Sequence, residues 1–284
     1  MSWFEAIWLG IIQGLTEFLP ISSSAHQFIF GQLAMGGRDP GAAFTAVTQL
    51  GTETAVIVYF FSDIVRIIKH WGLSLVGKID RRDPDARMGW LVIIGTLPIG
   101  ILGIIFQDAI DTHLRNLWLT VAMLAGVGIV LGVADRFAIA HQTKTLDQLS
   151  LKDGIIYGFC QACALIPGVS RSGGTISGGL FLGYTREAAT RYSFLLAIPA
   201  IYASGLFKLK DIGDDACVRW GPTILATVIS FVIGYAVIAW LIRYITTHSF
   251  KPFVIYRIGL ALVLAILLAL GVLDPVSTQV ACGA

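Results

Sequence analysis

Two polar turns rich in serine and glycine interrupt a sequence that is otherwise hydrophobic enough for a membrane. The first, QGLTEFLPISSSAH, runs from Gln13 to His26, and the second, ALIPGVSRSGGT, runs from Ala164 to Thr175. Carboxylate, imidazole and guanidinium groups are costly near a bilayer interior unless they face other helices or a wet cavity. Together the turns offer a candidate nucleophile, a proton carrier and an anion clamp, which predicts phosphate chemistry inside a membrane.

The second turn has the composition of an anion-binding site. Arg171 supplies a planar guanidinium suited to bidentate contact with phosphate oxygens. Backbone N–H groups in a glycine-rich turn at the start of a half-helix also attract anions. In the alternative interpretation, Arg171 only anchors the segment at the membrane interface. The residues that we expect to bind substrate here, besides Arg171, are Ser170, Ser172, Gly173 and Thr175.

The first turn holds the groups that could react with phosphorus. Ser23 lies between Ser22 and Ser24, two further hydroxyls that we expect to bind substrate. A serine hydroxyl needs a nearby base, and the imidazole of His26 is the usual kind of base at neutral pH. His26 could instead attack directly and form a phosphohistidine, or it could be a hydrogen-bonded structural residue.

Two carboxylates are candidates for supporting roles. Glu17 follows Gln13 by four residues, so the two side chains share a helix face. They could bind a divalent cation through a carboxylate and an amide oxygen, or Glu17 could orient His26. Glu53, at membrane depth in the next hydrophobic segment, could border the same site or form a structural hydrogen bond to a neighbouring helix.

The composition is that of an integral membrane protein. Apolar residues make up 56% of the 284-residue chain and charged residues 13%, whereas a soluble domain carries roughly a quarter charged residues. The basic residues lie in short loops, so the net charge of +2 indicates membrane topology and no nucleic-acid partner. Cys160 and Cys163 lack a second pair that would make a zinc site, whereas Cys217 and Cys282 could form a disulfide outside the membrane.

Six segments are long and apolar enough to cross a bilayer as helices of roughly 17–25 residues. Two shorter stretches, Phe4–Leu19 and Ile155–Ile166, each lead through a polar turn into a second short piece, Phe28–Leu33 and Ile176–Leu182. This pattern favours re-entrant hairpins over surface helices, because both stretches are poor in Lys and Arg. The six predicted spans are Phe44–Phe61, Trp90–Phe106, Leu117–Ala134, Tyr192–Leu209, Thr223–Ile242 and Phe253–Val272.

A weak internal repeat organises these segments. We predict an all-α integral membrane protein with a single domain, 1–284, made of two inverted-topology repeats, 1–136 and 137–284. Each repeat would contain a re-entrant helical hairpin and three transmembrane helices, and three crossings invert the second copy. A shift of 148 residues superposes Gly10 on Gly158, Gln13 on Gln161, Ser22 on Ser170, Ser24 on Ser172 and Asp63-Ile64 on Asp211-Ile212.

The distribution of basic residues predicts the orientation. With the loop after the first span in the cytoplasm, the inside segments hold fourteen Lys and Arg residues, Arg257 among them, and the outside segments hold five. The positive-inside rule then places both termini on the outer face. The first hairpin would enter the membrane from outside and the second from the cytoplasm.

The segments QGLTEFLPISSSAH and PGVSRSGGT resemble the two signature segments of the bacterial undecaprenyl-pyrophosphate phosphatases of the bacitracin-resistance type. The resemblance extends through most of the chain, including QLGT at Gln49 and YSFLLAIPA at Tyr192. It implies removal of the terminal phosphate from a C55 polyprenyl diphosphate, which yields the monophosphate carrier used in cell-wall synthesis. It also implies inverted repeats, a location in the bacterial plasma (inner) membrane and an active site open to the outer side.

Carried over by position, the resemblance makes Glu17 the key acidic residue and Arg171 the phosphate ligand. Ser23 and His26 become the candidates for nucleophile and base. A dependence on Mg²⁺ or Ca²⁺ is also implied, although Gln13 stands where many members of the family have glutamate. We expect the polyprenyl diphosphate lipid and the membrane as partners, and a homodimer is an open alternative. The main rival function is a lipid-phosphate transporter or flippase, since inverted repeats with broken helices also serve alternating access.

Overall fold

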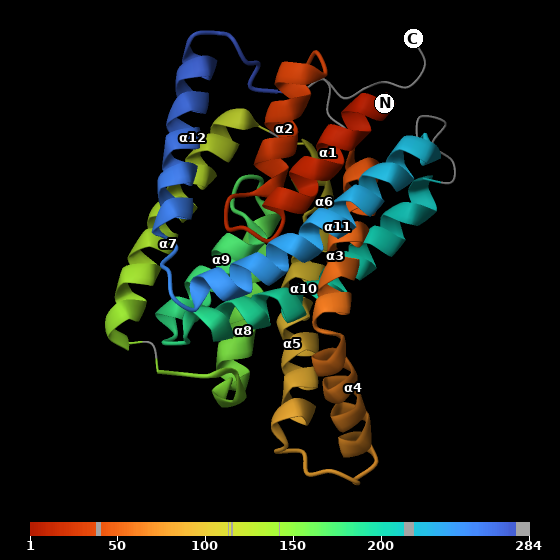
Figure 1. Ribbon diagram of the computed structural model, residues 1–284, viewed down its shortest axis with the longest axis vertical. Helices are drawn as coiled ribbons and strands as arrows, with labels where there is room; N and C mark the ends of the chain where they lie inside the picture. Colours follow the sequence, from red (N-terminus) through yellow and green to blue (C-terminus); the bar gives the residue numbers. More distant parts are fainter. Residues whose placement is uncertain (38–40, 113, 115, 142, 213–218, 277–284) are drawn as a thin grey trace.

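The chain folds into a bundle of helices, shown in Figure 1. The structure is a computed structural model that describes residues 1–37, 41–112, 114, 116–141, 143–212 and 219–276. Within these residues the regular elements are helical, which confirms the predicted all-α class. In chain order they are α1 (Trp3–Thr16), α2 (Ser23–Ala34), α3 (Ala42–Tyr59), α4 (Phe61–Leu75), α5 (Pro84–Ile105), α6 (Gln107–Thr112), α7 (Leu117–His141), the 3₁₀ turn η1 (Leu146–Gln148), α8 (Leu151–Ala162), the 3₁₀ turn η2 (Cys163–Leu165), α9 (Arg171–Phe181), α10 (Arg186–Ile212), α11 (Trp220–Ile245) and α12 (Lys251–Ala269).

Four helices in the described part of the chain are long and apolar enough to cross a membrane. They are α5, α7 over Leu117–Ile139, α11 and α12, and they overlap four of the six predicted spans. The other two predicted spans, Phe44–Phe61 and Tyr192–Leu209, fall on α3 and α10, which are helices of 18 and 27 residues. Helix α3 buries Thr48, Thr52 and Glu53 and so faces other helices with a polar side.

The two predicted hairpins are present as pairs of short helices, α1 with α2 and α8 with α9. Their lengths of 14, 12, 12 and 11 residues are too short to span a bilayer, which needs about 20 residues. Both second helices begin earlier than predicted: α2 starts at Ser23 and α9 at Arg171. For α9 the reason is helix capping, since Ser170 Oγ accepts a hydrogen bond from the Gly173 N–H and so starts the helix inside the polar turn, whereas Ser22 makes no such cap for α2.

The two turns share an unusual backbone conformation. Ser22 and Ser170, which the 148-residue shift superposes, have φ angles of 74° and 69°, and they are the only non-glycine residues with positive φ in the described part of the chain. Figure 1 shows α1 and α2 at the end of the molecule that carries the N-terminus, whereas α8 starts toward the opposite end, where the α4–α5 hairpin projects. The matching turns agree with a repeat, and its inversion stays a prediction.

Helix α11 holds the first hairpin in place by packing closely against α1 and α3. A Cβ atom on Gly51 would lie 2.3 Å from the Thr227 carbonyl oxygen, and one on Gly10 would lie 2.7 Å from the Ala226 carbonyl oxygen. Only glycine permits this approach of two backbones. The contact fixes α1 and α3 side by side and thereby positions the side chains that project from their ends. The predicted Cys217–Cys282 disulfide lies outside the described residues.

Candidate active site

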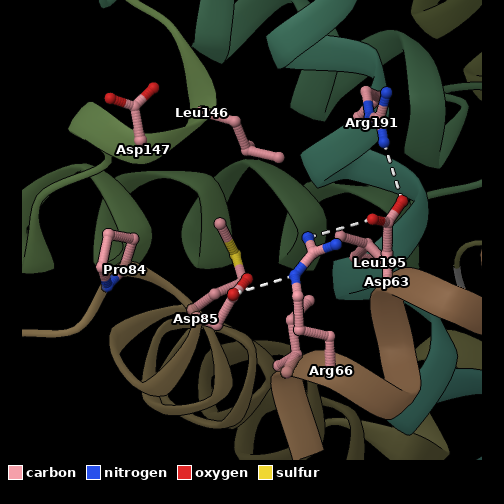
Figure 2. A pocket seen from close by; sticks show the side chains of 10 residues that line it. Asp63, Arg66, Pro84, Asp85, Leu146, Asp147, Arg191 and Leu195 are labelled. Atoms are coloured by element: carbon pink, nitrogen blue, oxygen red, sulfur yellow. Dashed lines mark hydrogen bonds and ion pairs between the residues drawn. The ribbon is translucent and has the colours of Figure 1, made fainter. Parts of the chain in front are cut away.

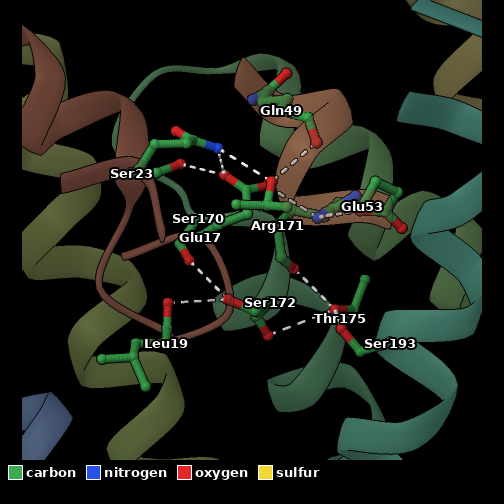
Figure 3. Close-up of polar contacts among 12 residues, drawn as sticks. Glu17, Leu19, Ser23, Gln49, Glu53, Ser170, Arg171, Ser172, Thr175 and Ser193 are labelled. Carbon is green, nitrogen blue, oxygen red and sulfur yellow. Dashed lines mark hydrogen bonds and ion pairs between the residues drawn. The ribbon is translucent and has the colours of Figure 1, made fainter. Parts of the chain in front are cut away.

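The tips of the two hairpins meet at the carboxylate of Glu17, the residue that ends α1. Its Oε1 accepts a hydrogen bond from Nη2 of Arg171 at 2.9 Å, and its Oε2 accepts one from Oγ of Ser23 at 2.7 Å. The Glu17 and Arg171 side chains are only 5% and 12% exposed. Figure 3 shows how this contact joins a candidate base, a candidate nucleophile and a candidate anion ligand from both hairpins.

A second carboxylate lies beside this cluster. Glu53 on α3 is fully buried, and its Oε2 is 3.7 Å from Nη2 of Arg171. Within the described residues neither oxygen of Glu53 has a hydrogen-bond partner, and Nη1 of Arg171 also has none. Of the two alternatives for Glu53, the structure therefore supports the one in which it borders the site.

Glu17 is also held by a chain of hydrogen bonds between amide and hydroxyl groups. Gln13 Nε2 donates to Glu17 Oε2 at 2.8 Å, and Gln27 Nε2 donates to Gln13 Oε1. Thr45 Oγ1 in turn donates to Gln27 Oε1 at 3.0 Å. In this arrangement the amide nitrogen of Gln13 faces the carboxylate, whereas its oxygen is occupied by Gln27. Gln13 therefore orients Glu17 and reduces the conformational freedom of its side chain.

His26 lies in the same hairpin but makes different contacts. Its Nδ1 is 2.7 Å from the Ser22 carbonyl oxygen, so Nδ1 carries a proton, because a carbonyl can only accept. Its Nε2 is 2.6 Å from the hydroxyl of Tyr256 on α12, and the two rings stack at 5.6 Å between centroids. The structure thus brings Ser23 to Glu17 and His26 to Tyr256, and it does not join Ser23 to His26 by a hydrogen bond.

The hydroxyls of the second turn make hydrogen bonds within the protein, and one of them joins the two turns. Ser172 Oγ donates to the Leu19 carbonyl of the first turn at 3.1 Å, and Thr175 Oγ1 donates to the Arg171 carbonyl at 2.8 Å. Ser170 caps α9 and lies 3.2 Å from Ser172 Oγ. The first turn contains the matching contact, Ser22 Oγ to Ser24 Oγ at 3.1 Å. Among these predicted substrate ligands, Ser24 is the exposed one.

Sequence reasoning missed the role of Arg257. The topology analysis counted it among the cytoplasmic loop residues, but it is a fully buried residue of α12. Its guanidinium donates to five backbone carbonyls, which links both turns to α7. Four of the accepting oxygens are 2.9–3.1 Å away and the fifth is at 3.2 Å, and they belong to Pro20, Met123, Leu124, Gly168 and Val169. The available signal was an arginine within an apolar helix, where such a residue needs internal partners.

A cavity of about 240 Å³ lies away from the hairpin tips, at the base of the α4–α5 hairpin (Figure 2). Ion pairs cross its wall: Arg66 Nε is 2.8 Å from Asp85 Oδ2, and Arg191 Nη2 is 2.7 Å from Asp63 Oδ2. The first pair joins α4 to α5, and the second joins α10 to α4. The lining residues are Asp63, Arg66, Ile67, Pro84, Asp85, Met88, Leu146, Asp147, Arg191 and Leu195.

His70, Asp83 and Asp85, beside this cavity, are close enough together to hold a metal ion. Their contacts have a structural explanation, however. Asp83 caps α5 by accepting from the N–H groups of Asp85 and Ala86, and His70 Nδ1 is 2.9 Å from Asp83 Oδ1. The Ala86 amide and the His70 ring lower the pKa of Asp83, which keeps this cap charged.

The fold and the hairpin cluster define a helical membrane protein with a buried Glu–Ser–Arg site at the meeting point of two broken hairpins. The model of one family, described as bacitracin resistance protein BacA, matches residues 6–263. The chain belongs to this family, which confirms the resemblance seen in the two turns.

Close relatives cover nearly the whole chain. Undecaprenyl-diphosphatase 2 of Streptomyces coelicolor is 58% identical over 285 residues, covering 97% of this chain and 98% of the relative. The undecaprenyl-diphosphatase of Pseudarthrobacter chlorophenolicus is 59% identical over 280 residues, covering 96% and 100%. That of Micrococcus luteus is 57% identical over 278 residues, with the same coverage.

Proposed function

We propose that this protein is a membrane phosphatase that hydrolyses undecaprenyl diphosphate to undecaprenyl phosphate and inorganic phosphate. The reaction would recycle the lipid carrier of cell-wall synthesis and confer bacitracin resistance. The observation that carries the proposal is the Glu17 carboxylate shared between Ser23 and Arg171, since it combines base, nucleophile and phosphate ligand. The printed activity of the relatives supports the same substrate.

In the proposed reaction Ser23 is the nucleophile and Glu17 its base. Oγ of Ser23 attacks the terminal phosphorus while its proton passes to Oε2 of Glu17, at 2.7 Å in the resting structure. The bond from the terminal phosphorus to the bridging oxygen breaks, and undecaprenyl phosphate leaves. Water then attacks the phosphorus of the phosphoserine and the bond from phosphorus to Oγ breaks. Oγ of Ser23 takes back the proton that Glu17 holds, and inorganic phosphate leaves with the protons of the water.

Arg171 binds the phosphoryl oxygens in this scheme. Its Nη2 is occupied by Glu17 in the resting structure, whereas Nη1 has no partner within the described residues. An incoming diphosphate can therefore contact Nη1 first and then compete with Glu17 for Nη2. The positive charge would stabilise the negative charge that develops on the departing lipid phosphate.

Direct attack by His26 is the alternative chemistry. Because Nδ1 donates to the Ser22 carbonyl, the lone pair for attack is on Nε2, which lies 2.6 Å from the Tyr256 hydroxyl. His26 would have to break its hydrogen bond to Tyr256 before Nε2 could attack phosphorus, whereas the hydroxyl of Ser23 already contacts its base, Glu17. This difference favours Ser23 as nucleophile and leaves His26 to exchange protons with water at the edge of the site.

The proposed reaction uses Mg²⁺ or Ca²⁺, which Glu17 would hold with Gln13 as the second ligand that the sequence suggests. Carboxylate oxygens suit both ions, and the oxygens of buried Glu53, which accept no hydrogen bond from the described residues, support this proposal. When bound, the ion supplies charge neutralisation for the phosphoryl oxygens.

We also propose the membrane placement that the sequence predicts. The two halves would be inverted repeats in the bacterial inner membrane, with the site open to the outer side and a homodimer as one assembly. The matching serine turns and the opposite placement of the hairpins in Figure 1 support this arrangement. The diphosphate head group would enter between the hairpin tips while the polyprenyl tail stays in the bilayer.

The direct test is release of inorganic phosphate from undecaprenyl diphosphate by the purified chain in detergent. Phosphate release is the expected result, and trapped protein should carry phosphoserine at Ser23 by mass spectrometry. Ser23→Ala should abolish this adduct, whereas a phosphohistidine at His26 would reverse the assignment of the nucleophile. Lipid movement across vesicles without phosphate release would instead support the transporter.

A further inference from the structure

We propose that Glu53 is a ligand of the divalent cation, paired with Glu17 from the other side of the site. This inference rests on the proposed function, because that function requires the cation. It assigns a chelating role to a residue of α3, outside both polar turns. The two carboxylates would then reach the ion from different helices.

The first argument is the state of the Glu53 carboxylate. It is fully buried, yet neither oxygen accepts a hydrogen bond from any described residue. A buried carboxylate without hydrogen bonds is strongly unfavourable unless something else provides positive charge. Both oxygens of Glu53 are thus available to bind a cation. Mg²⁺ and Ca²⁺ prefer oxygen ligands of this kind.

The contact with Arg171 does not account for Glu53 by itself. The separation of 3.7 Å between Oε2 and Nη2 is longer than a hydrogen bond, and Nη2 already donates to Glu17. A structural ion pair would use the free Nη1 in a bidentate contact, but Nη1 has no partner among the described residues. Both groups therefore retain unused capacity for binding.

The balance of charge gives an independent argument. Glu17 and Glu53 bring two carboxylates to one arginine, and a diphosphate adds further negative charge to the same volume. At this low exposure such repulsion is weakly screened, so the substrate complex needs another positive charge. Arg257 is engaged in the scaffold, since each of its three guanidinium nitrogens already donates to a backbone carbonyl.

Glu53 is also better placed as a second ligand than Gln13. The amide of Gln13 presents nitrogen to Glu17, and its oxygen accepts from Gln27. Nitrogen of an amide does not coordinate Mg²⁺ or Ca²⁺, whereas both oxygens of Glu53 are available. Two carboxylates from α1 and α3 then form the ligand pair, and Gln13 holds one of them in place.

Binding of the cation alone can be measured without substrate or turnover. The full-length chain in detergent is titrated with MgCl₂ and with CaCl₂, and its melting temperature is followed by tryptophan fluorescence. The wild type should show a saturable rise, because an ion that binds only the folded state stabilises it. Glu187→Gln, at an exposed carboxylate of α10, is the matched control, and Asp85→Asn tests the His70–Asp83–Asp85 group.

Glu53→Gln should not lower the melting temperature in the absence of cation, but it should weaken the binding of the cation. Without cation it should melt at or above the wild-type temperature, because a buried carboxylate that accepts no hydrogen bond has been removed. The half-saturating cation concentration should rise at least about tenfold, since even outer-shell partners of metals are worth 10–100-fold in affinity. Glu53→Asp keeps the charge on a shorter side chain and should titrate between the two; it carries the test if the glutamine variant does not fold.

The proposal is overturned if Glu53→Gln, or in its place Glu53→Asp, titrates like the wild type. It is equally overturned if the wild type shows no saturable rise, or if Asp85→Asn alone removes the rise. Phosphate release is not part of this readout. Failure of cation binding at Glu53 and failure of the phosphatase function can therefore be told apart.

Discussion

The two hairpins share an unusual turn conformation and carry different chemistry. Ser22 and Ser170 adopt the same positive φ, and each hydroxyl contacts the serine two residues further on, at 3.1 and 3.2 Å. At the next position the 148-residue shift places Arg171 on Ser23, and at the end of α1 it places Leu165 on Glu17. The first hairpin therefore presents a candidate nucleophile and a carboxylate, whereas the second presents the positive charge of Arg171.

The two equivalent glutamines make the same distinction. Gln13 donates to Glu17 and accepts from Gln27, whereas Gln161 is fully buried and neither its nitrogen nor its oxygen has a partner in the described part of the chain. The two hairpins thus share the conformation of the turn, but only the first uses the glutamine of its first helix in a hydrogen bond to the site. Two similar turns that carry different side chains bring opposite charges together at their contact.

The largest expected effect tests whether Glu17 and Arg171, the charged residues that differ between the hairpins, take part in the reaction. Glu17→Ala and Arg171→Ala should each reduce phosphate release by about 100-fold or more, since one removes the base and the other a charged ligand of the transition state. Arg171→Lys, which keeps the charge but loses the planar fork, should fall between. The measurement is the steady-state rate with undecaprenyl diphosphate in detergent.

Each variant should retain the cooperative thermal unfolding of the wild type, which shows that a lost rate is not a lost fold. Activity near the wild-type level in either alanine variant would mean that the Glu17–Arg171 pair only joins the two hairpins.

The next effect concerns Arg257, which connects the two turns through its hydrogen bonds to backbone carbonyls. Arg257→Met should lower stability by about 3–5 kcal/mol, because several buried carbonyls lose their donor at once. The melting temperature should fall clearly, and activity should fall with it. Arg243→Met, at an exposed arginine near the end of α11, is the control for removing a positive charge. Equal melting temperatures for the two variants would show that the turns keep their places without Arg257.

The same substitution should have different effects at the two glutamines: it should stabilise the protein at Gln161 and reduce activity at Gln13. Gln161→Leu should stabilise the protein by about 1 kcal/mol, since an unpartnered buried amide is replaced by an apolar side chain, and phosphate release should stay near the wild-type rate. Gln13→Leu should reduce the rate about tenfold or more, because Glu17 loses the donor that orients it. Thermal unfolding and initial rates on both variants decide the comparison, and matching losses of activity would indicate that both glutamines serve the site.

Local features of the sequence were sufficient to predict the site's contents. Composition gave the membrane class, the Pro/Gly interruptions gave the two hairpins, and ionisable residues at membrane depth gave Glu17 and Arg171. These signals are reliable because a bilayer makes each polar side chain costly. The predicted starts of α2 and α9 were late because both helices begin inside the polar turns, directly after Ser22 and Ser170.

Contacts between distant segments could not be predicted. The pairing of Ser23 with Glu17 depends on the path of the turn, and the pairing of His26 with Tyr256 joins residues 230 positions apart. Arg257 was counted among the inside basic residues although it lies within the predicted span Phe253–Val272. Its role was missed because its five acceptors are backbone carbonyls, which leave no pattern in a single sequence. Each of these arrangements is decided by tertiary packing.

The smallest effect compares the two turns themselves. Positive φ costs a non-glycine residue of order 1 kcal/mol, so glycine should relieve this strain at Ser22 and at Ser170 alike. Ser170 Oγ also accepts from the Gly173 N–H, a cap worth a few tenths of a kcal/mol relative to glycine, whereas Ser22 makes no such cap. Ser22→Gly should therefore melt slightly higher than Ser170→Gly in the same detergent. Ser22→Ala and Ser170→Ala, which keep the strain and lose the hydroxyl, are the controls. If Ser170→Gly proves the more stable of the two, the cap contributes nothing, and the turns differ only in the side chains that they present.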